Sequence, residues 1–238
     1  MGKLARLWLR ALALAVLASP GAARAAGPAD LNATERRWLE AALPVLQFGR
    51  EQGLPLDILI HPQAAPGDTP LGLAWVDGRC KLVLAMRGNP EAQATLDRIA
   101  PDLQGPVIEA IAAHELAHCW RHVQQAWGTL PAGLTDTAWR LRVTPEQAAL
   151  LDDMWRTRRE EAYADLVGLA WTLRHHAAQY AAVHAWHVTL RARQAVETGP
   201  HDTRPWVQLA QDPTAFSSAG SLFEQVQPLW WAGFRGHP

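Results

Sequence analysis

The sequence predicts an α+β fold in which a small β-sheet comes first and the rest of the chain is mostly helical. Runs rich in β-forming residues are confined to positions 56–86, and from Pro90 onward apolar residues recur at helical spacing. With 238 residues, of which 49% are hydrophobic, the chain has enough apolar material for one core. We therefore expect a single domain over residues 26–238.

The first 25 residues have the pattern of a signal peptide. A positively charged start precedes a short apolar run at 11–18, and small residues flank Arg24 at Ala23 and Ala25. Such a run is too short to remain as a membrane-spanning helix, although a retained N-terminal anchor is the alternative. We expect cleavage near Ala25 or Ala26, no permanent membrane span afterwards, and export to the periplasm or the medium.

The front of the mature chain should contain one helix and three strands. A helix is expected over 31–52, with Asn32 or Thr34 as its cap and a bend or break at Pro44. Strands are expected over 56–60, 71–76 and 80–86, the last two joined by a hairpin turn at Asp77-Gly78. We expect these strands to form a mostly antiparallel sheet.

Helical spacing of apolar residues continues to the C-terminus. Pro106 suits the first turn of a helix, and Thr144 suits a helix cap. The expected helices cover residues 90–99, 106–127, 145–175, 177–197 and 221–231, with loops at 130–134 and 198–204.

The helix expected over 106–127 contains the motif His114-Glu115-x-x-His118. Residues four apart share one helix face, so both imidazoles can reach a single ion. Glu115 lies one position round the helix, where it can contact a water molecule on that ion rather than serve as a ligand. This pattern predicts a zinc hydrolase centre with Glu115 as general base. His122, a full turn beyond His118, is predicted to lie at the surface.

A catalytic zinc ion needs a third protein ligand, and the next long helix offers Glu161. Asp165 follows on the same face and could accept a hydrogen bond from a ligand histidine. One alternative is that Glu161 is an exposed acid paired with Arg158. The other is that Glu160 takes the place of Glu161 as ligand, if the helix is rotated by one residue from the expected phase.

His114-Glu115-x-x-His118 followed by Glu161-x-x-Ala164-Asp165 resembles the gluzincin metallopeptidases, and is most similar to the branch of prenyl-protein proteases and their periplasmic relatives. The resemblance implies a zincin-like fold with two active-site helices. It also implies that His114, His118 and Glu161 bind one zinc ion, that Glu115 is the base, and that Asp165 orients His114. A strand before the first active-site helix would bind substrate backbone, and 80–86 is the candidate.

The same family places an oxyanion-stabilising residue downstream. His201 and Arg204 in the loop before Pro205 are the candidates, with Tyr163 third; the alternative is a polar loop without a role. Four further histidines, on helices rich in Ala and Trp, are predicted to lie at the core edge or surface: His175, His176, His184 and His187.

Together these patterns predict an exported zinc metallopeptidase that acts on peptide or protein substrates. Two alternatives are a zinc-stabilised chaperone or binding module of the cell envelope, and a zinc hydrolase of a cell-wall amide. The net charge of −1 gives no field that attracts nucleic acid. Cys80 and Cys119 could pair in an oxidising compartment or remain buried thiols. The helix over 31–52 could block the cleft.

Overall fold

A computed structural model describes residues 31–61, 64–65, 68–130, 144–194, 199–218 and 220–235. The predicted signal peptide and most of the predicted 130–134 loop lie outside these residues. The described residues belong to one compact unit. Its elements in chain order are α1 (Ala33–Glu51), β1 (Leu56–Ile60), β2 (Leu71–Val76), β3 (Arg79–Leu84), α2 (Pro90–Asp97), η2 (Pro101–Leu103), α3 (Gln104–Val123), α4 (Pro145–His175), η4 (Ala177–Gln179), α5 (Tyr180–Gln194), α6 (Arg204–Leu209), η5 (Pro213–Ala215), α7 (Leu222–Gln225) and α8 (Gln227–Arg235).

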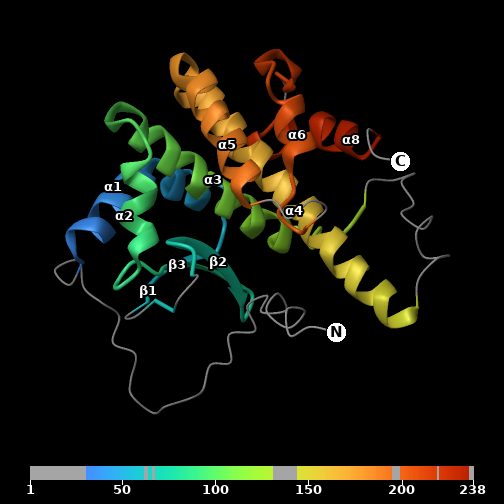
Figure 1. The fold of residues 1–238 in the computed structure, drawn as a ribbon, viewed down its shortest axis with the longest axis horizontal. Coiled ribbons are helices and arrows are strands. Elements are labelled where there is room, and N and C mark those ends of the chain that lie inside the picture. The colour runs from blue at the N-terminus through green and yellow to red at the C-terminus, as the bar shows by residue number, and fades with distance from the viewer. Residues whose placement is uncertain are drawn as a thin grey trace, which may run out of the picture. The chain divides into compact units, whose positions relative to one another are not determined.

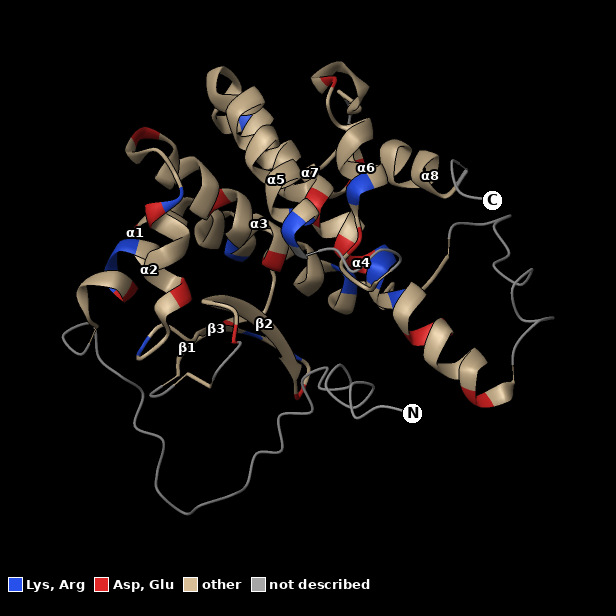
Figure 2. Cartoon of the chain, in the orientation of Figure 1, with Lys and Arg blue, Asp and Glu red and all other residues tan. Residues whose placement is uncertain are grey.

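This content confirms the predicted α+β class with a mostly helical remainder (Figure 1). No helix within the described ranges has both the length and the hydrophobicity that crossing a membrane requires. Acidic and basic positions are interspersed over the described helices rather than gathered on one of them (Figure 2).

Helix α1 continues through Pro44, so of the predicted bend or break the break is wrong. Pro44 lies on the exposed side, while residues before and after it bury one shared apolar stripe: Trp38, Ala42, Val45 and Leu46. Burial of this stripe outweighs the one backbone hydrogen bond that proline cannot donate. The predicted cap is present, because Asn32 accepts from the backbone amide of Glu35 at 2.8 Å.

The sheet has the strand order β1-β3-β2 and is mixed rather than mostly antiparallel. The turn at Asp77-Gly78 pairs β2 with β3 antiparallel as predicted, and both turn residues have positive φ. Strand β1 instead pairs parallel with β3. The connection between β1 and β2 is long enough to carry the chain past β3, and hydrophobic spacing within a strand does not specify its neighbour.

Strand β3 is therefore the centre of the sheet, so the strand over 80–86 has no free edge with which to bind substrate backbone, contrary to what the family resemblance had implied. Both edges of β3 are hydrogen-bonded, to β1 and to β2. Of the two outer strands, β2 packs against α3. An extended ligand could add to β2, but it could not add to β3.

Helix α3 begins at Gln104, directly after η2, and ends at Val123 rather than at the predicted Trp127. The helix ends because Gln125 adopts a left-handed φ of 53° and the amide of Ala126 bonds back to the carbonyl of Arg121 at 2.8 Å. Trp127 lies in the turn that follows. The motif residues thus occupy the second half of a regular helix.

A disulfide joins Cys80 of β3 to Cys119 of α3, which follows His118 directly. It closes a loop with a sequence separation of 39 residues. Constraining a loop of that length in the unfolded chain stabilises a protein by about 4 kcal/mol in the chain-entropy account. The bond fixes the HExxH helix to the central strand.

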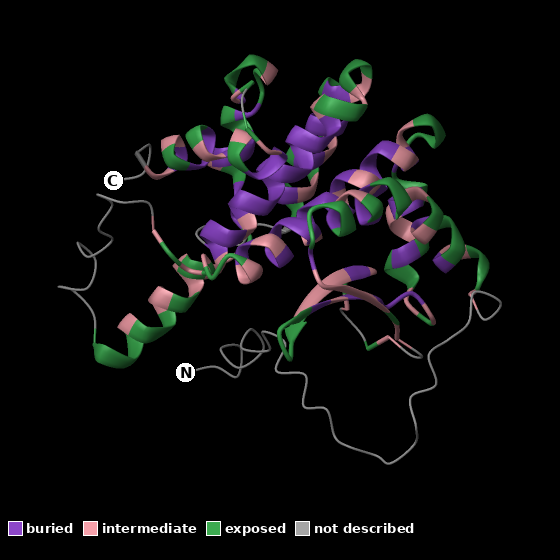
Figure 3. Ribbon diagram, turned by 180° about the vertical axis from the view of Figure 1, so that it is seen from behind, coloured by how far each residue is buried: buried purple, intermediate pink, exposed green. Residues whose placement is uncertain are grey.

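Helix α4 changes character along its length. Its first turns, after the Thr144 cap, are largely exposed and project from the other elements, whereas nearly every residue from Arg158 to Thr172 is buried (Figures 1 and 3). Glu161 and Asp165 belong to the buried half, which crosses α3.

The crossing depends on Gly168. A Cβ atom added there would lie 2.7 Å from the backbone oxygen of Ala110 on α3, and backbone cannot rotate away as a side chain can. The absence of a side chain at this position lets α4 approach α3 closely.

We expect Gly168→Ala to lower the free energy of unfolding by about 1–3 kcal/mol, because overpacking forces the two helices apart. Gly105→Ala is the control: Gly105 is a glycine of α3, and an added Cβ there meets nothing within 4 Å. That variant should be neutral or slightly stabilised. Urea unfolding measures both, and equal stability of the two variants would contradict the packing argument.

The C-terminal third differs from prediction in its boundaries. The helix predicted over 177–197 is η4 followed by α5, and the segment predicted over 221–231 is α7 and α8. Helix α6 and η5 were not predicted, because both are short and lack a clear apolar period. Helices α5, α6, α7 and α8 all pack on α4.

Candidate metal centre

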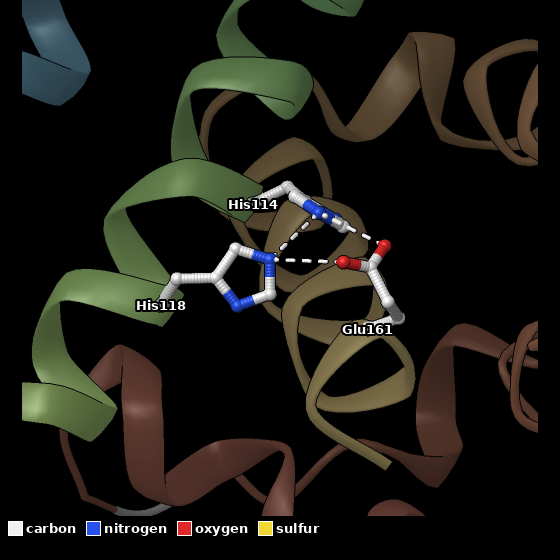
Figure 4. Close-up of side chains that lie close together, drawn as sticks. All are labelled: His114, His118 and Glu161. Carbon is white, nitrogen blue, oxygen red and sulfur yellow. Dashed lines mark hydrogen bonds and ion pairs between the residues drawn. The ribbon is translucent and has the colours of Figure 1, made fainter. Parts of the chain in front are cut away.

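His114, His118 and Glu161 converge between α3 and α4 (Figure 4). The two histidine Nε2 atoms are 3.1 Å apart. Oε2 of Glu161 lies 3.5 Å from Nε2 of His114, and Oε1 lies 3.4 Å from Nε2 of His118. All three side chains are at least four-fifths buried, with exposed fractions of 10%, 10% and 15%. The predicted ligand set is thus brought together.

These separations suit a tetrahedral metal ion. Ligand atoms about 2.0–2.1 Å from a zinc ion, at tetrahedral angles, lie about 3.3 Å from one another. Two imidazole nitrogens and one carboxylate are also a typical donor set of catalytic zinc, which leaves one position open. Among the residues that the structure describes, His114, His118 and Glu161 form the group of histidine, cysteine or acidic side chains that lie close enough together to hold one ion.

Asp165 orients His114. Oδ1 of Asp165 lies 2.9 Å from Nδ1 of His114, so a proton on Nδ1 leaves the lone pair of Nε2 directed at the cluster. Burial lowers the pKa of His114, but this hydrogen bond and the nearby charge of Glu161 outweigh burial and raise it. Protons should therefore compete with a metal ion at acidic pH. Nδ1 of His118 has no such partner among the described residues.

Glu115 lies beside this cluster without being part of it. Its side chain is partly buried and makes no hydrogen bond to any described residue. Burial raises the pKa of Glu115, partly offset by His114 and His118, and Glu161 raises it further. A carboxylate with a raised pKa is a better proton acceptor near neutral pH than an ordinary one.

The phase of α4 selects Glu161 rather than Glu160. The carboxylate of Glu160 instead accepts two hydrogen bonds from Arg121, at 2.8 and 2.7 Å, and one from the amide of Gly128. Tyr163, two positions beyond Glu161, donates its hydroxyl to the carbonyl of Phe223 at 2.8 Å and is buried. Its hydroxyl is therefore engaged in the core, away from the cluster.

The downstream loop reaches the cluster through His201 and Thr203. Nε2 of His201 lies 4.0 Å from Oε1 of Glu161, with half of its side chain exposed. Arg204 forms an ion pair with Asp202 at 2.7 Å. Thr203 was not predicted, yet its buried hydroxyl donates to Oδ2 of Asp165 at 2.5 Å. An oxyanion role for His201 or Arg204 stays a prediction.

Arg191 of α5 is the other site residue that sequence reasoning missed. Its guanidinium contacts both Asp165 and Glu161, and its exposed fraction is 5%. The charge of Arg191 holds the pKa of Asp165 well below its ordinary value despite burial. One feature of the sequence could have indicated Arg191. It lies near the end of a helix rich in apolar residues, and an arginine buried in such a helix usually pairs with an acidic side chain.

His122 is partly buried, and its ring stacks on two indoles. Trp127 lies 4.1 Å away and Trp75 of β2 lies 5.2 Å away, both nearly parallel to the imidazole. The ring of Trp127 also meets the ring of His118, one of the three candidate ligands, edge-on at 5.5 Å. His122 therefore belongs to an aromatic stack beside the site.

The remaining histidines divide into two groups. His175 stacks on Trp171, and His176 lies 3.0 Å from a carboxylate oxygen of Glu109. His184 and His187 are buried rather than at the surface, and Nε2 of His184 lies 2.8 Å from the carbonyl of Val207. Neither ring nitrogen of His187 has a hydrogen-bond partner among the described residues.

His187 should make stability depend on pH. Burial lowers its pKa from 6.5 to about 4, so below pH 6.5 the unfolded chain binds the proton more readily than the folded one. The stability that the neutral ring contributes is complete above pH 6.5 and is lost as the pH falls toward 4. We expect a loss of about 2 kcal/mol between pH 7 and pH 5.

Urea unfolding of the metal-free protein at both pH values measures this loss. His187→Leu should reduce it, because leucine fills the buried position without a titrating group. An identical pH dependence in both proteins would show that His187 is not responsible.

Comparison of the chain with protein-family models, with curated proteins and with solved structures gave no match.

Proposed function

We propose that this chain is a zinc-dependent metallopeptidase with a gluzincin-like centre in a zincin-like fold. The observation that carries the proposal is the spacing of the donor side chains on two crossing helices: the two histidine Nε2 atoms are 3.1 Å apart, and each lies within 3.5 Å of one of the two carboxylate oxygens of Glu161. Beside them lies Glu115, which makes no hydrogen bond to a described residue. A purely structural zinc site usually closes all four positions with protein ligands and needs no base.

In this proposal the described side chains divide the work. Zinc, when bound, supplies the Lewis acidity that makes a water molecule a nucleophile near neutral pH. His114, His118 and Glu161 hold the ion, and Asp165 keeps His114 in the tautomer that can bind it. Glu115 accepts a proton from the water and later donates it to the leaving amine. His201, whose Nε2 lies 4.0 Å from Oε1 of Glu161, would stabilise negative charge on the substrate oxygen.

Strand β2 is the proposed binding edge for an extended peptide. It is an outer strand and packs against α3, which carries Glu115 and the two histidines. A peptide that adds to β2 would satisfy its free backbone groups and run along α3. The N-terminal pattern extends the proposal to an exported protein, with cleavage near Ala25.

The test is hydrolysis of a peptide library by the purified mature chain. Turnover should disappear with a chelator and return when zinc is added back. Zinc binding without peptide hydrolysis would refute the peptidase and favour either the envelope binding module or the hydrolase of a cell-wall amide. Assays with amide cross-linked cell-wall fragments separate those two.

A further inference from the structure

We propose that Arg191 is a positioning residue of the metal centre, which fixes Asp165 and Glu161 in the orientation that lets His114 and Glu161 hold the ion. The inference rests on the proposed function, because it assumes a metal ion at this site. It does not depend on what the site hydrolyses.

The first argument is the complete hydrogen bonding of Asp165. Oδ1 accepts from Nδ1 of His114 at 2.9 Å and from Nη2 of Arg191 at 2.5 Å. Oδ2 accepts from Nε of Arg191 at 2.7 Å and from Thr203 at 2.5 Å. A carboxylate has about four lone-pair sites, so every one has a donor. Half of these donors are on Arg191, whose planar fork sets the rotation of the carboxylate.

The second argument is the bridge to a ligand. Nη2 of Arg191 also lies 3.3 Å from Oε2 of Glu161, the same oxygen that faces Nε2 of His114 at 3.5 Å. Glu161 and Asp165 are buried carboxylates one turn apart on α4, and like charges at that spacing repel. The guanidinium of Arg191, which contacts both carboxylates, offsets this repulsion and defines where each carboxylate lies.

The third argument is that a lysine cannot replace this geometry. Arginine presents donors in a rigid plane that matches a carboxylate, whereas lysine offers one point of charge on a flexible stem. Arg191 is also 5% exposed, so neighbouring side chains hold its stem in place. The position therefore requires the shape of a guanidinium as well as its charge.

The experiment compares zinc affinity, by competition with a metal-binding dye, in wild type, Arg191→Ala, Arg191→Lys and Arg121→Ala. Arg121 is the matched control because it forms a similarly buried, two-pronged pair with Glu160, which is not one of the three donors. We expect Arg191→Ala to lower zinc affinity about 10- to 100-fold. Arg121→Ala should lower stability but keep zinc affinity near that of wild type.

Millimolar methylguanidinium, well below denaturing concentrations, should restore part of the zinc affinity of Arg191→Ala. Zinc affinity equal to wild type in Arg191→Ala, or an equal loss in Arg121→Ala, overturns the inference. If Arg191→Ala does not fold, Arg191→Lys decides: its cobalt-substituted form should have a visible spectrum altered from wild type, and an unchanged spectrum overturns the inference. Wild type that binds zinc without cleaving peptides refutes only the peptidase.

Discussion

Replacement of Glu115 by Gln is expected to lower the turnover number for peptide hydrolysis by about 10²- to 10⁴-fold while zinc stays bound. Glutamine has nearly the same shape but cannot accept a proton from water. The three proposed ligands do not include Glu115, so zinc affinity should change little. Steady-state kinetics and metal analysis of the same preparation provide the two readouts.

Glu109→Gln is the control for this experiment. Glu109 lies on the same helix, but its carboxylate accepts from the indole of Trp171 at 2.8 Å instead of lying beside the cluster. Turnover by this variant should remain near that of wild type. Activity retained in Glu115→Gln, or lost equally in both variants, would contradict a general-base role for Glu115.

The part of the site that sequence predicted is the part that helix geometry determines locally. His114 and His118 share a face because they are four residues apart, and the same holds for Glu161 and Asp165. Once both pairs are known, one crossing of two helices brings them together. Small residues on the second helix, above all Gly168, made that crossing foreseeable, and an added Cβ there would meet the backbone of α3.

The parts that sequence did not predict arise from tertiary contacts. Arg191 and Thr203 reach Asp165 from segments 26 and 38 residues downstream, and no local period indicates their partner. The mixed sheet was missed for the same reason. Strand β1 pairs parallel with β3, and the hydrophobic spacing within β1 does not specify which strand it pairs with. The stack of His122 with Trp75 and Trp127 joins a strand, a helix and a turn.

Replacement of His118 by Ala is expected to reduce zinc affinity by more than the roughly 10- to 100-fold that loss of a ligand's hydrogen-bond partner costs. An ion that binds only the folded protein also stabilises the folded state. The stabilisation is about 2.7 kcal/mol when the free ion is at 100 times its dissociation constant. A chelator should therefore lower the unfolding free energy of wild type by about that amount and leave His118→Ala unchanged.

His122→Ala tests whether the effect belongs to the cluster or to any histidine of α3. Its ring is stacked on Trp127 at 4.1 Å and lies one turn beyond His118, so a straight helix cannot aim it at the same point as His114. His122→Ala should keep the chelator-dependent stability of wild type, even if loss of stacking lowers its stability overall. Because both variants remove one imidazole from one helix, only the position of the lost nitrogen differs. Loss of the chelator effect in both would remove the geometric basis for assigning the ion to His114, His118 and Glu161.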